Sequence, residues 1–356
     1  MSDFNKKIIR WQIKHGRHGL PWQFRSTDAR DGSSAYRVWL SEIMLQQTQV
    51  MAVIPYYEKF LARFPDIASL ASAPQAEVMQ YWAGLGYYAR ARNLHRAAQQ
   101  VVELHGSVLP NDFEAIHALP GVGRSTAAAI SAFAFGQRAA ILDGNVKRVF
   151  ARHFGVHGDV KSTPITNQLW EIAEAELPTK DIAATIGAYT QGLMDLGATL
   201  CTRTKPACLL CPVQKTCVAK RDGLTEILPG KGIKRQIPHR EIQMLVVIDS
   251  GQVLLEKRPP TGIWGGLWSL PECAVDIDAL EMAQKRFVIK AKKTKMLATL
   301  EHGFTHYSLS IFPTVIHVIS KQPRAMEAGL IWLDLNDVDT AALPAPVKKI
   351  LLGLAP

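Results

Sequence analysis

The sequence predicts a mainly helical region over residues 1–225 and a small α+β domain over residues 241–356, joined by a linker at residues 226–240. Three observations support this fold class. Apolar side chains recur at helical spacing in the first part, and short runs typical of β-strands appear in the last part. Between them the composition shifts to Gly, Pro and basic residues, which is typical of a connection between domains.

The first part contains segments with clear helical periodicity. Residues 93–104 form one of them, and Gly106 follows as a stop signal. The apolar stripe of this segment consists of Leu94, Ala97, Ala98, Val101 and Val102. Residues 125–135 are small and apolar enough to form a buried helix. Residues 24–37 are polar instead, and we expect an exposed loop there.

The last part contains β-type runs at residues 244–248, 253–255 and 309–319. Pro313 lies inside the third run. Because proline cannot donate to a sheet ladder, its presence indicates an edge strand or a bulge. Together these short runs predict a small sheet domain.

The chain is strongly basic, with a formal net charge of +10 and a sequence pI of about 9.4. Such an excess favours a polyanionic partner. No apolar run is long enough to span a membrane, and the N-terminal residues are too polar for a secretory signal. We therefore expect a cytoplasmic protein with no membrane partner.

Four of the five cysteines, Cys201, Cys208, Cys211 and Cys217, fall within 17 residues, which indicates a ligand set. Six, two and five residues separate them in turn. Zinc in a four-thiolate site usually uses two close pairs, whereas this single tight pair with wider flanks suits a 4Fe–4S cluster. Two disulfides or four buried thiols are the alternatives.

Residues 119–126 read LPGVGRST and predict a tight hairpin between two helices. Gly121 and Gly123 let the backbone approach closely, and the N–H groups at the following helix start can hold a phosphate. An ordinary connection between two helices is the alternative.

Two carboxylates stand out in the helical region. Glu42 lies within an apolar helical segment, residues 38–50. Desolvation there should raise its pKa, as a general acid working near neutral pH requires, although a surface position on an amphipathic helix is the alternative. Asp143 precedes Gly144, and a simple helix N-cap is the alternative reading of this residue. Its spacing from the glycine hairpin indicates a further role.

The stretches 38–50, 84–93 and 119–126 closely resemble the adenine DNA glycosylase (MutY) family of the helix–hairpin–helix/GPD, endonuclease III-like superfamily. The resemblance covers nearly the whole chain. It implies a helix–hairpin–helix glycosylase fold with a 4Fe–4S loop at residues 201–217, followed by a Nudix-like (MutT-like) domain. It also implies a monomer that excises adenine opposite 8-oxoguanine or guanine in duplex DNA during base excision repair.

The resemblance assigns roles to the catalytic candidates. Glu42 would protonate adenine at N7, Asp143 would stabilise the sugar cation, and Asn145 would orient the site. Lyase relatives carry a lysine at the position of Ser125, where it forms a Schiff base. Since serine offers no amine, the family pattern implies a monofunctional enzyme.

The same resemblance implies a set of DNA contacts. Gln47, Thr48 and the Phe304-Thr305-His306 motif would contact 8-oxoguanine, with threonine in place of the family's serine. Leu85 and Tyr87 would wedge into the duplex, and Gln191 would lie near the adenine pocket. The remaining candidates, Gly121, Gly123 and Lys147, would contact phosphates.

Three rival functions agree less well with the sequence. An endonuclease III-like glycosylase and lyase acting on oxidised pyrimidines is disfavoured by Ser125 and by the C-terminal domain. A Nudix hydrolase is disfavoured because Gln284 and Lys285 replace the glutamate pair that should hold metal ions, although Gly266 and Glu272 match. A non-catalytic iron–sulfur DNA-binding protein is disfavoured by the presence of Glu42 and Asp143.

Overall fold

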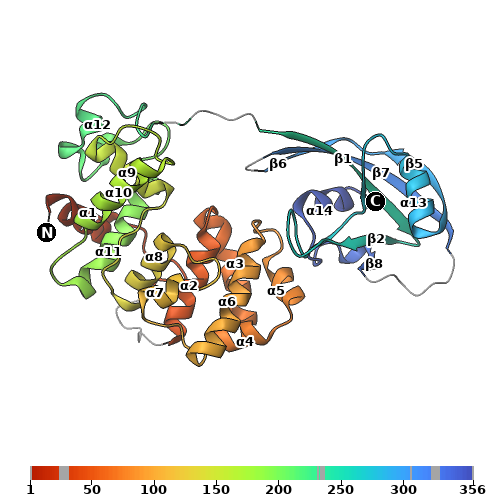
Figure 1. Cartoon of the computed structure of the whole chain (residues 1–356), viewed down its shortest axis with the longest axis horizontal. Coiled ribbons are helices and arrows are strands. Elements are labelled where there is room, and N and C mark those ends of the chain that lie inside the picture. Colours follow the sequence, from red (N-terminus) through yellow and green to blue (C-terminus); the bar gives the residue numbers. More distant parts are fainter. Residues whose placement is uncertain are drawn as a thin grey trace. The chain divides into compact units, whose positions relative to one another are not determined.

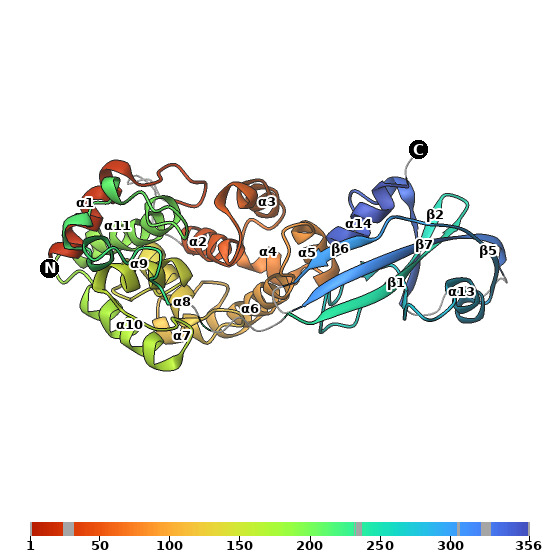
Figure 2. The same ribbon diagram turned by 90° about the horizontal axis from the view of Figure 1, so that it is seen from above.

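A computed structural model of the chain describes residues 2–23, 32–230, 232, 237–304, 307–321 and 329–354 (Figures 1 and 2). The chain forms two compact units. The first comprises Met1–Ser72 and Asn93–Lys234, and the second comprises Ala73–Arg92 and Arg235–Pro356. Thr305 and His306 of the predicted recognition motif lie outside the described residues.

The first unit is helical, as the sequence predicts. Its helices are α1 (Asp3–His15), α2 (Gly32–Leu45), α3 (Val50–Arg63), α4 (Ile67–Ser72), most of α6 (Ala89–His105), α7 (Phe113–His117), α8 (Arg124–Phe135), α9 (Gly144–Phe154), α10 (Thr163–Ala175), α11 (Ile182–Asp195) and α12 (Val218–Arg221). A π-helical turn, η1 (Leu196–Leu200), extends α11, and short 3₁₀ turns, η2 (Cys208–Leu210) and η3 (Gln214–Thr216), shape the cysteine loop.

Helix α8 lies in the core of this unit, against α2, α7 and α11. Its alanines leave room for close packing, and residues from Ala127 to Ala132 are buried. The prediction of a buried helix at residues 125–135 is therefore confirmed. The same buried cluster extends from the α8 alanines to α1, α9 and α11 around Ile8, Phe150 and Leu193.

Two local predictions need correction. The expected exposed loop at residues 24–37 is wrong from Gly32 onward, where α2 begins. Tyr36 is buried there, and its hydroxyl donates to the Phe64 carbonyl oxygen at 2.9 Å. In α6, Val102 is 37% exposed although the other members of its predicted stripe are buried. A residue at the edge of the apolar face of a helix can still be exposed to solvent.

The second unit contains helix α5 (Gln75–Trp82) and a mixed sheet packed against two further helices. The strands are β1 (His239–Asp249), β2 (Gln252–Lys257), β3 (Trp268–Ser269), β4 (Glu272–Cys273), β5 (Ile289–Met296), β6 (Leu300–Gly303), β7 (Ser308–Lys321) and β8 (Leu330–Asp334). The helices are α13 (Ala279–Phe287) and α14 (Ala345–Leu352), with a 3₁₀ turn at Leu335–Asp337.

Among the described residues, the sheet runs in the order β3-β2-β1-β7-β5, with β4 on β1, β6 on β7 and β8 on β2. Strands β1 and β7 are parallel and lie side by side in Figure 2. Helix α13 packs on β5 and β1 over a buried cluster that includes Leu245 and Ile316. The predicted sheet domain is confirmed.

Pro313 does not mark an edge strand, because β7 lies between β1 and the strands β5 and β6. The registers of β7 shift elsewhere, so Pro313 marks no bulge either. It falls between Ile311, the last residue paired with β6, and Thr314, which pairs with β5. The missing N–H therefore sits where the antiparallel partner changes.

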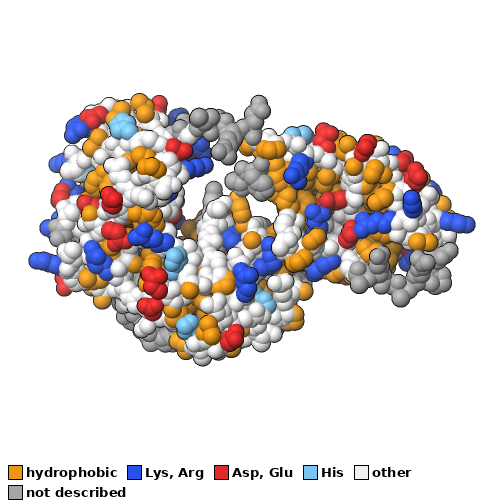
Figure 3. Space-filling view, viewed as in Figure 1, with side chains coloured by type: hydrophobic (Ala, Val, Ile, Leu, Met, Phe, Trp, Pro, Cys, Tyr) orange, Lys and Arg blue, Asp and Glu red, His pale blue; other side chains and the backbone are white. Residues whose placement is uncertain are grey.

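No helix in the described part of the chain is long and apolar enough to cross a membrane. Lys and Arg side chains occur on the face of each unit that Figure 3 shows, in keeping with the basic composition.

Candidate active site

The predicted hairpin joins α7 to α8. Gly121 has φ +80°, and a Cβ atom there would lie 2.8 Å from Cβ of Asn93, so the turn requires glycine on both counts. Gly123 is the N-cap of α8, and it supplies no side-chain acceptor for the first N–H groups of the helix. Such a helix start can receive an anion.

Glu42 lies on α2, where Trp39, Ile43 and other apolar side chains are buried. Its own side chain keeps some exposure, but the groups packed around the carboxyl exclude most of the water. This burial, with a smaller contribution from the negative charge of Asp143, raises the pKa of Glu42 to about 8. A carboxyl group with this pKa is mostly protonated at neutral pH, as the sequence argument anticipated.

Asp143 caps α9, and its Oδ1 accepts from the backbone N–H of Val146 at 2.8 Å. Burial of the carboxyl raises its pKa, although bonds from the Val146 and Asn145 backbone and the nearby charge of Arg148 lower it. The residue is nevertheless open to solvent on one side. Its charge acts on Glu42, so the fold brings the two predicted carboxylates into one site.

Ser125 lies in the first turn of α8, and its hydroxyl accepts from the backbone N–H of Leu142 at 2.9 Å. Leu142 immediately precedes Asp143. The serine therefore fixes the backbone that leads into the capping carboxylate.

Asn145 connects the start of α9 to the cysteine loop through Arg148. Its Oδ1 accepts from Arg148 Nη2 at 2.9 Å, and Arg148 Nε donates to the Cys201 carbonyl oxygen at 2.8 Å. Gly197 lies against Asn145, where a Cβ atom would approach the asparagine Cβ to 2.8 Å. Asn145 is thus held from two sides.

Lys147 is less available than its predicted phosphate contact suggests. Its ammonium group donates to the Val160 carbonyl oxygen and to Thr166 Oγ1, each at 3.0 Å. An ammonium has three donors, so one remains for a further partner.

The four clustered cysteines form no disulfides and are partly buried. Burial, with smaller contributions from the charges of Cys201, Cys217 and Cys208, raises the pKa of the Cys211 thiol to about 12. The sulfurs therefore lie close enough to repel one another as thiolates, which a bound cationic centre would relieve.

Arg152 supports the same loop from α9. It is 3% exposed, and its guanidinium donates to Sγ of Cys201 at 3.4 Å and to the Thr202 carbonyl oxygen at 2.6 Å. No three or more His, Cys, Asp or Glu side chains among the described residues are arranged to hold a single metal ion. Four cysteine thiolates are the donor set that typically holds a 4Fe–4S cluster.

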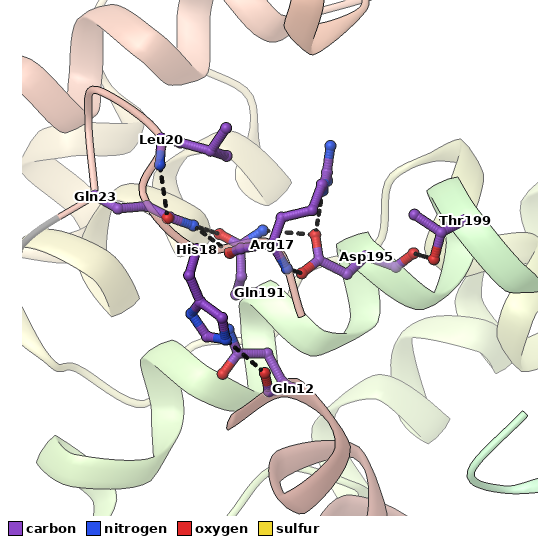
Figure 4. A network of polar contacts seen from close by, with 8 residues as sticks. All are labelled: Gln12, Arg17, His18, Leu20, Gln23, Gln191, Asp195 and Thr199. Atoms are coloured by element: carbon purple, nitrogen blue, oxygen red, sulfur yellow. Dashed lines mark hydrogen bonds and ion pairs between the residues drawn. The ribbon is translucent and has the colours of Figure 1, made fainter. Parts of the chain in front are cut away.

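Gln191 belongs to a polar network that sequence reasoning missed (Figure 4). Its Nε2 donates to Oδ1 of Asp195 at 2.8 Å, and its Oε1 accepts from Gln23 at 3.3 Å. Asp195 also accepts from Nε and from the backbone N–H of Arg17, at 2.6 and 2.8 Å. A buried carboxylate in an apolar helix is the signal that singled out Glu42, and it could have found Asp195 as well.

The predicted duplex contacts have unusual backbone conformations. Gln47 and Tyr87 have φ of +58° and +49°, values that residues other than glycine rarely adopt. Gln47 is exposed and Tyr87 is 49% exposed, as DNA contacts require. Thr48 follows Gln47 in the same turn, whereas Leu85 is 8% exposed and would have to move to enter a duplex.

In the second unit, Phe304 directly follows strand β6. Its ring stacks on Tyr307 with centroids 4.5 Å apart, and Trp264 lies 5.6 Å away. In the remnant of the Nudix motif, Glu272 forms an ion pair with Arg258 at 2.6 Å. That carboxylate is engaged by a cation of the chain itself.

Comparison with known proteins identifies both regions. The family model of the HhH-GPD superfamily base excision DNA repair proteins matches residues 40–175, and that of the NUDIX domain matches residues 243–353. A thermostable thymine-DNA glycosylase of known structure is 30% identical, covers 62% of this chain and 95% of its own, and superposes with a TM-score of 0.53. An endonuclease III in complex with DNA, 18% identical with a TM-score of 0.50 over 62% of this chain and 95% of its own, shares the fold.

Two relatives that match nearly the whole chain carry the same name. The adenine DNA glycosylase of Buchnera aphidicola subsp. Acyrthosiphon pisum is 36% identical over 350 residues, covering 98% of this chain and 96% of the relative. The adenine DNA glycosylase of Homo sapiens is 32% identical over 408 residues, covering 98% of this chain and 73% of the relative. The family indicated by the motifs is confirmed: the chain belongs to the adenine DNA glycosylase family, hydrolases of base excision repair within the HhH-GPD superfamily.

Proposed function

We propose that this enzyme is a monofunctional glycosylase that removes adenine opposite 8-oxoguanine or guanine in duplex DNA. The observation that carries the proposal is the coupling of Glu42 and Asp143, two carboxyl groups in different environments at one site. Burial raises the pKa of both groups, whereas backbone hydrogen bonds and the charge of Arg148 favour the charged form of Asp143. Such a difference in environment divides acid work from charge stabilisation.

Glu42 acts first as the acid. The target adenine must leave the base stack, at an expense of a few kcal/mol that a mispair lowers. The neutral Glu42 carboxyl gives its proton to adenine N7, the C1′–N9 bond breaks, and its electron pair leaves with the base. The resulting Glu42 carboxylate then accepts a proton from the water that attacks C1′.

Asp143 stabilises the sugar cation that forms between these events. The backbone N–H groups of Val146 and Asn145, together with Arg148, favour its charged form. A fixed carboxylate beside a developing positive charge lowers the barrier without reorganisation during the reaction. Since Ser125 offers no amine and its hydroxyl is engaged by Leu142, no Schiff base forms and the strand stays intact.

A 4Fe–4S cluster held by Cys201, Cys208, Cys211 and Cys217 is part of the proposal. Endonuclease III-like members of the superfamily typically bind one. Free, mutually repelling thiols and the buried guanidinium of Arg152 fit such a cluster. When bound, it would supply a cross-link for the loop, and the residues of the loop would carry no reaction step.

The remaining assignments follow from family membership. Residues 1–225 would form the catalytic region, residues 226–240 the linker, and residues 241–356 a domain that recognises 8-oxoguanine through Phe304, Thr305 and His306. Gln284 and Lys285 cannot hold metal ions as a glutamate pair would, so this domain binds without hydrolysis. We infer a monomer acting on duplex DNA in the cytoplasm.

The test is single-turnover release of adenine from a duplex with one A opposite 8-oxoguanine, with A opposite G and A opposite T as controls. Products are resolved with and without alkali. Alkali-dependent cleavage at the mispaired A is expected. Breaks without alkali would instead indicate a lyase, and equal release from all three duplexes would contradict the mispair specificity.

A further inference from the structure

The base of the β6–β7 hairpin is joined to the first residue of β1. His239 lies opposite Ser308 in the parallel β1–β7 ladder, and the Ser308 N–H donates to the Pro238 carbonyl oxygen at 2.9 Å. The hairpin carries Phe304 at its β6 end and Tyr307 at its β7 end. The start of β1 is therefore the structural neighbour of this hairpin.

A chain of side-chain contacts crosses three strands at this point. His239 Nδ1 lies 2.9 Å from Ser308 Oγ, and His239 Nε2 lies 3.1 Å from Ser310 Oγ. Ser310 in turn donates to Glu301 Oε1 on β6 at 2.5 Å. The contacts thus run from β7 to β1, return to β7 and end on β6.

The donor inventory fixes the direction of this chain. Ser310 has one hydroxyl proton, and it goes to Glu301, so Ser310 must accept from an N–H at His239 Nε2. At the other side of the ring, Nδ1 pairs with the Ser308 hydroxyl, while Glu241 Oε1 lies 3.7 Å from Nε2. Every donor meets an acceptor, and Ser310 is only 5% exposed, so water competes poorly at the centre of the chain.

The next residue of β1 contacts the tip side of the same hairpin. The Arg240 guanidinium lies 5.1 Å from the centre of the Tyr307 ring, which stacks on Phe304. The Phe304 N–H donates to the Tyr307 carbonyl oxygen at 2.8 Å and closes the turn. Two consecutive residues of β1 therefore hold both the base and the aromatic pair of the hairpin.

We propose that His239 is a positioning residue for recognition of the base opposite adenine. By tying Ser308 and Ser310 to β1 and to Glu301, it sets where the β6–β7 hairpin presents Phe304. This inference rests on the proposed 8-oxoguanine preference and names a residue that sets its size. His239 itself touches no reacting atom.

The experiment compares His239→Ala with His317→Ala in the full-length enzyme. His317 is a matched control, because it lies at the other end of the same β1–β7 ladder, opposite Ile248. Single-turnover adenine release is measured opposite 8-oxoguanine and opposite guanine, and thermal denaturation is recorded for each variant. The readout is the ratio of the two rates.

His239→Ala should lower that ratio by about tenfold, as the loss of one or two oriented hydrogen bonds would, while the rate opposite guanine stays near that of the unaltered enzyme. His317→Ala should keep the ratio. His239→Gln can place an amide N–H near the Nε2 position and should restore part of the ratio. Ser310→Ala, which interrupts the chain at its centre, should lower the ratio as well.

Either of two results would overturn the inference. One is an unchanged ratio in both His239→Ala and Ser310→Ala, and the other is an equal fall of both rates with a matching loss of thermal stability, which would mark a purely structural contact. If the unaltered enzyme shows no preference for 8-oxoguanine, the proposed specificity fails instead, independently of His239.

Discussion

The Ser125 hydroxyl accepts the backbone N–H of Leu142 at 2.9 Å, one residue before the capping carboxylate of Asp143. The contact joins the first turn of α8 to the segment that leads into α9. A serine that is distant in sequence from Asp143 can therefore affect the backbone next to this carboxylate. We expect Ser125 to act on the position of Asp143 through Leu142.

Replacing Ser125 with alanine leaves the Leu142 N–H without this partner. We expect adenine release to slow by about tenfold, the effect of losing roughly one net hydrogen bond at a positioned group. Ser131→Ala is the control, since Ser131 lies buried in the same helix and its hydroxyl has no partner among the described residues. Single-turnover rates of the two variants decide the matter, and equal rates would refute the positioning role.

Glu42→Gln removes the proton that adenine N7 is expected to receive. The rate of base release should fall by about 10²–10⁴, the usual share of general acid catalysis. Binding of the mispaired duplex should change little, because glutamine keeps the size of the side chain. Normal release by Glu42→Gln, measured under the same single-turnover conditions, would show that another group supplies the proton.

The raised pKa of Glu42 also predicts a pH-dependent stability. The folded-state pKa of about 8 lies above the usual 4.5, so the protonated form is favoured by folding. The contribution of the protonated Glu42 carboxyl to the unfolding free energy is fully present below pH 4.5 and is lost as pH rises toward 8. Glu42→Gln should escape this loss and gain on the order of 4 kcal/mol in unfolding free energy relative to the unaltered chain by pH 8. Denaturant melts at pH 5 and pH 8 test this, and a constant difference between the two chains would contradict the assignment.

Gly121→Ala should distort the hairpin before α8. The φ of +80° and the close approach to Asn93 both exclude a Cβ atom, and a loss of about 1–3 kcal/mol in unfolding free energy is expected. Gly123→Ala is a fitting control, since Gly123 has φ −84° and open space around its α-carbon. Thermal melts of the two variants should differ clearly, and a similar melt for both would show that the turn tolerates a side chain.

Substitution of Cys208 with serine should lower the iron content of the purified enzyme and the absorbance of its sulfur-to-iron charge-transfer bands. Cys273→Ser should retain both, because Cys273 lies in the second unit, on β4. Iron analysis separates the outcomes. Full iron content in Cys208→Ser would remove this cysteine from the ligand set.

Local chemistry accounts for what the sequence could predict. An isolated carboxylate among apolar residues, a glycine hairpin and a cluster of cysteines are each recognisable in a short window, and these windows point to Glu42, Gly121 and Cys211. The change from helical to strand periodicity likewise predicted the two kinds of structure.

Contacts between distant segments account for what it could not. Arg17 meets Asp195, and His239 meets Ser310, only because the fold brings separate helices or strands together. Pro313 was misassigned for the same reason, since the change of partner from β6 to β5 depends on three strands at once. Periodicity in one segment carries no information about such pairings.

The second unit includes a piece of chain that precedes most of the first. Residues 73–92 lie with residues 235–356, where Gln80 donates to the Thr340 carbonyl oxygen, Tyr88 to that of Leu343 and Arg92 to that of Gly265. A stop codon near residue 225 would therefore remove most of the second unit and leave residues 73–92 without the carbonyl acceptors of their hydrogen bonds. A truncation at the linker does not separate the two folded units.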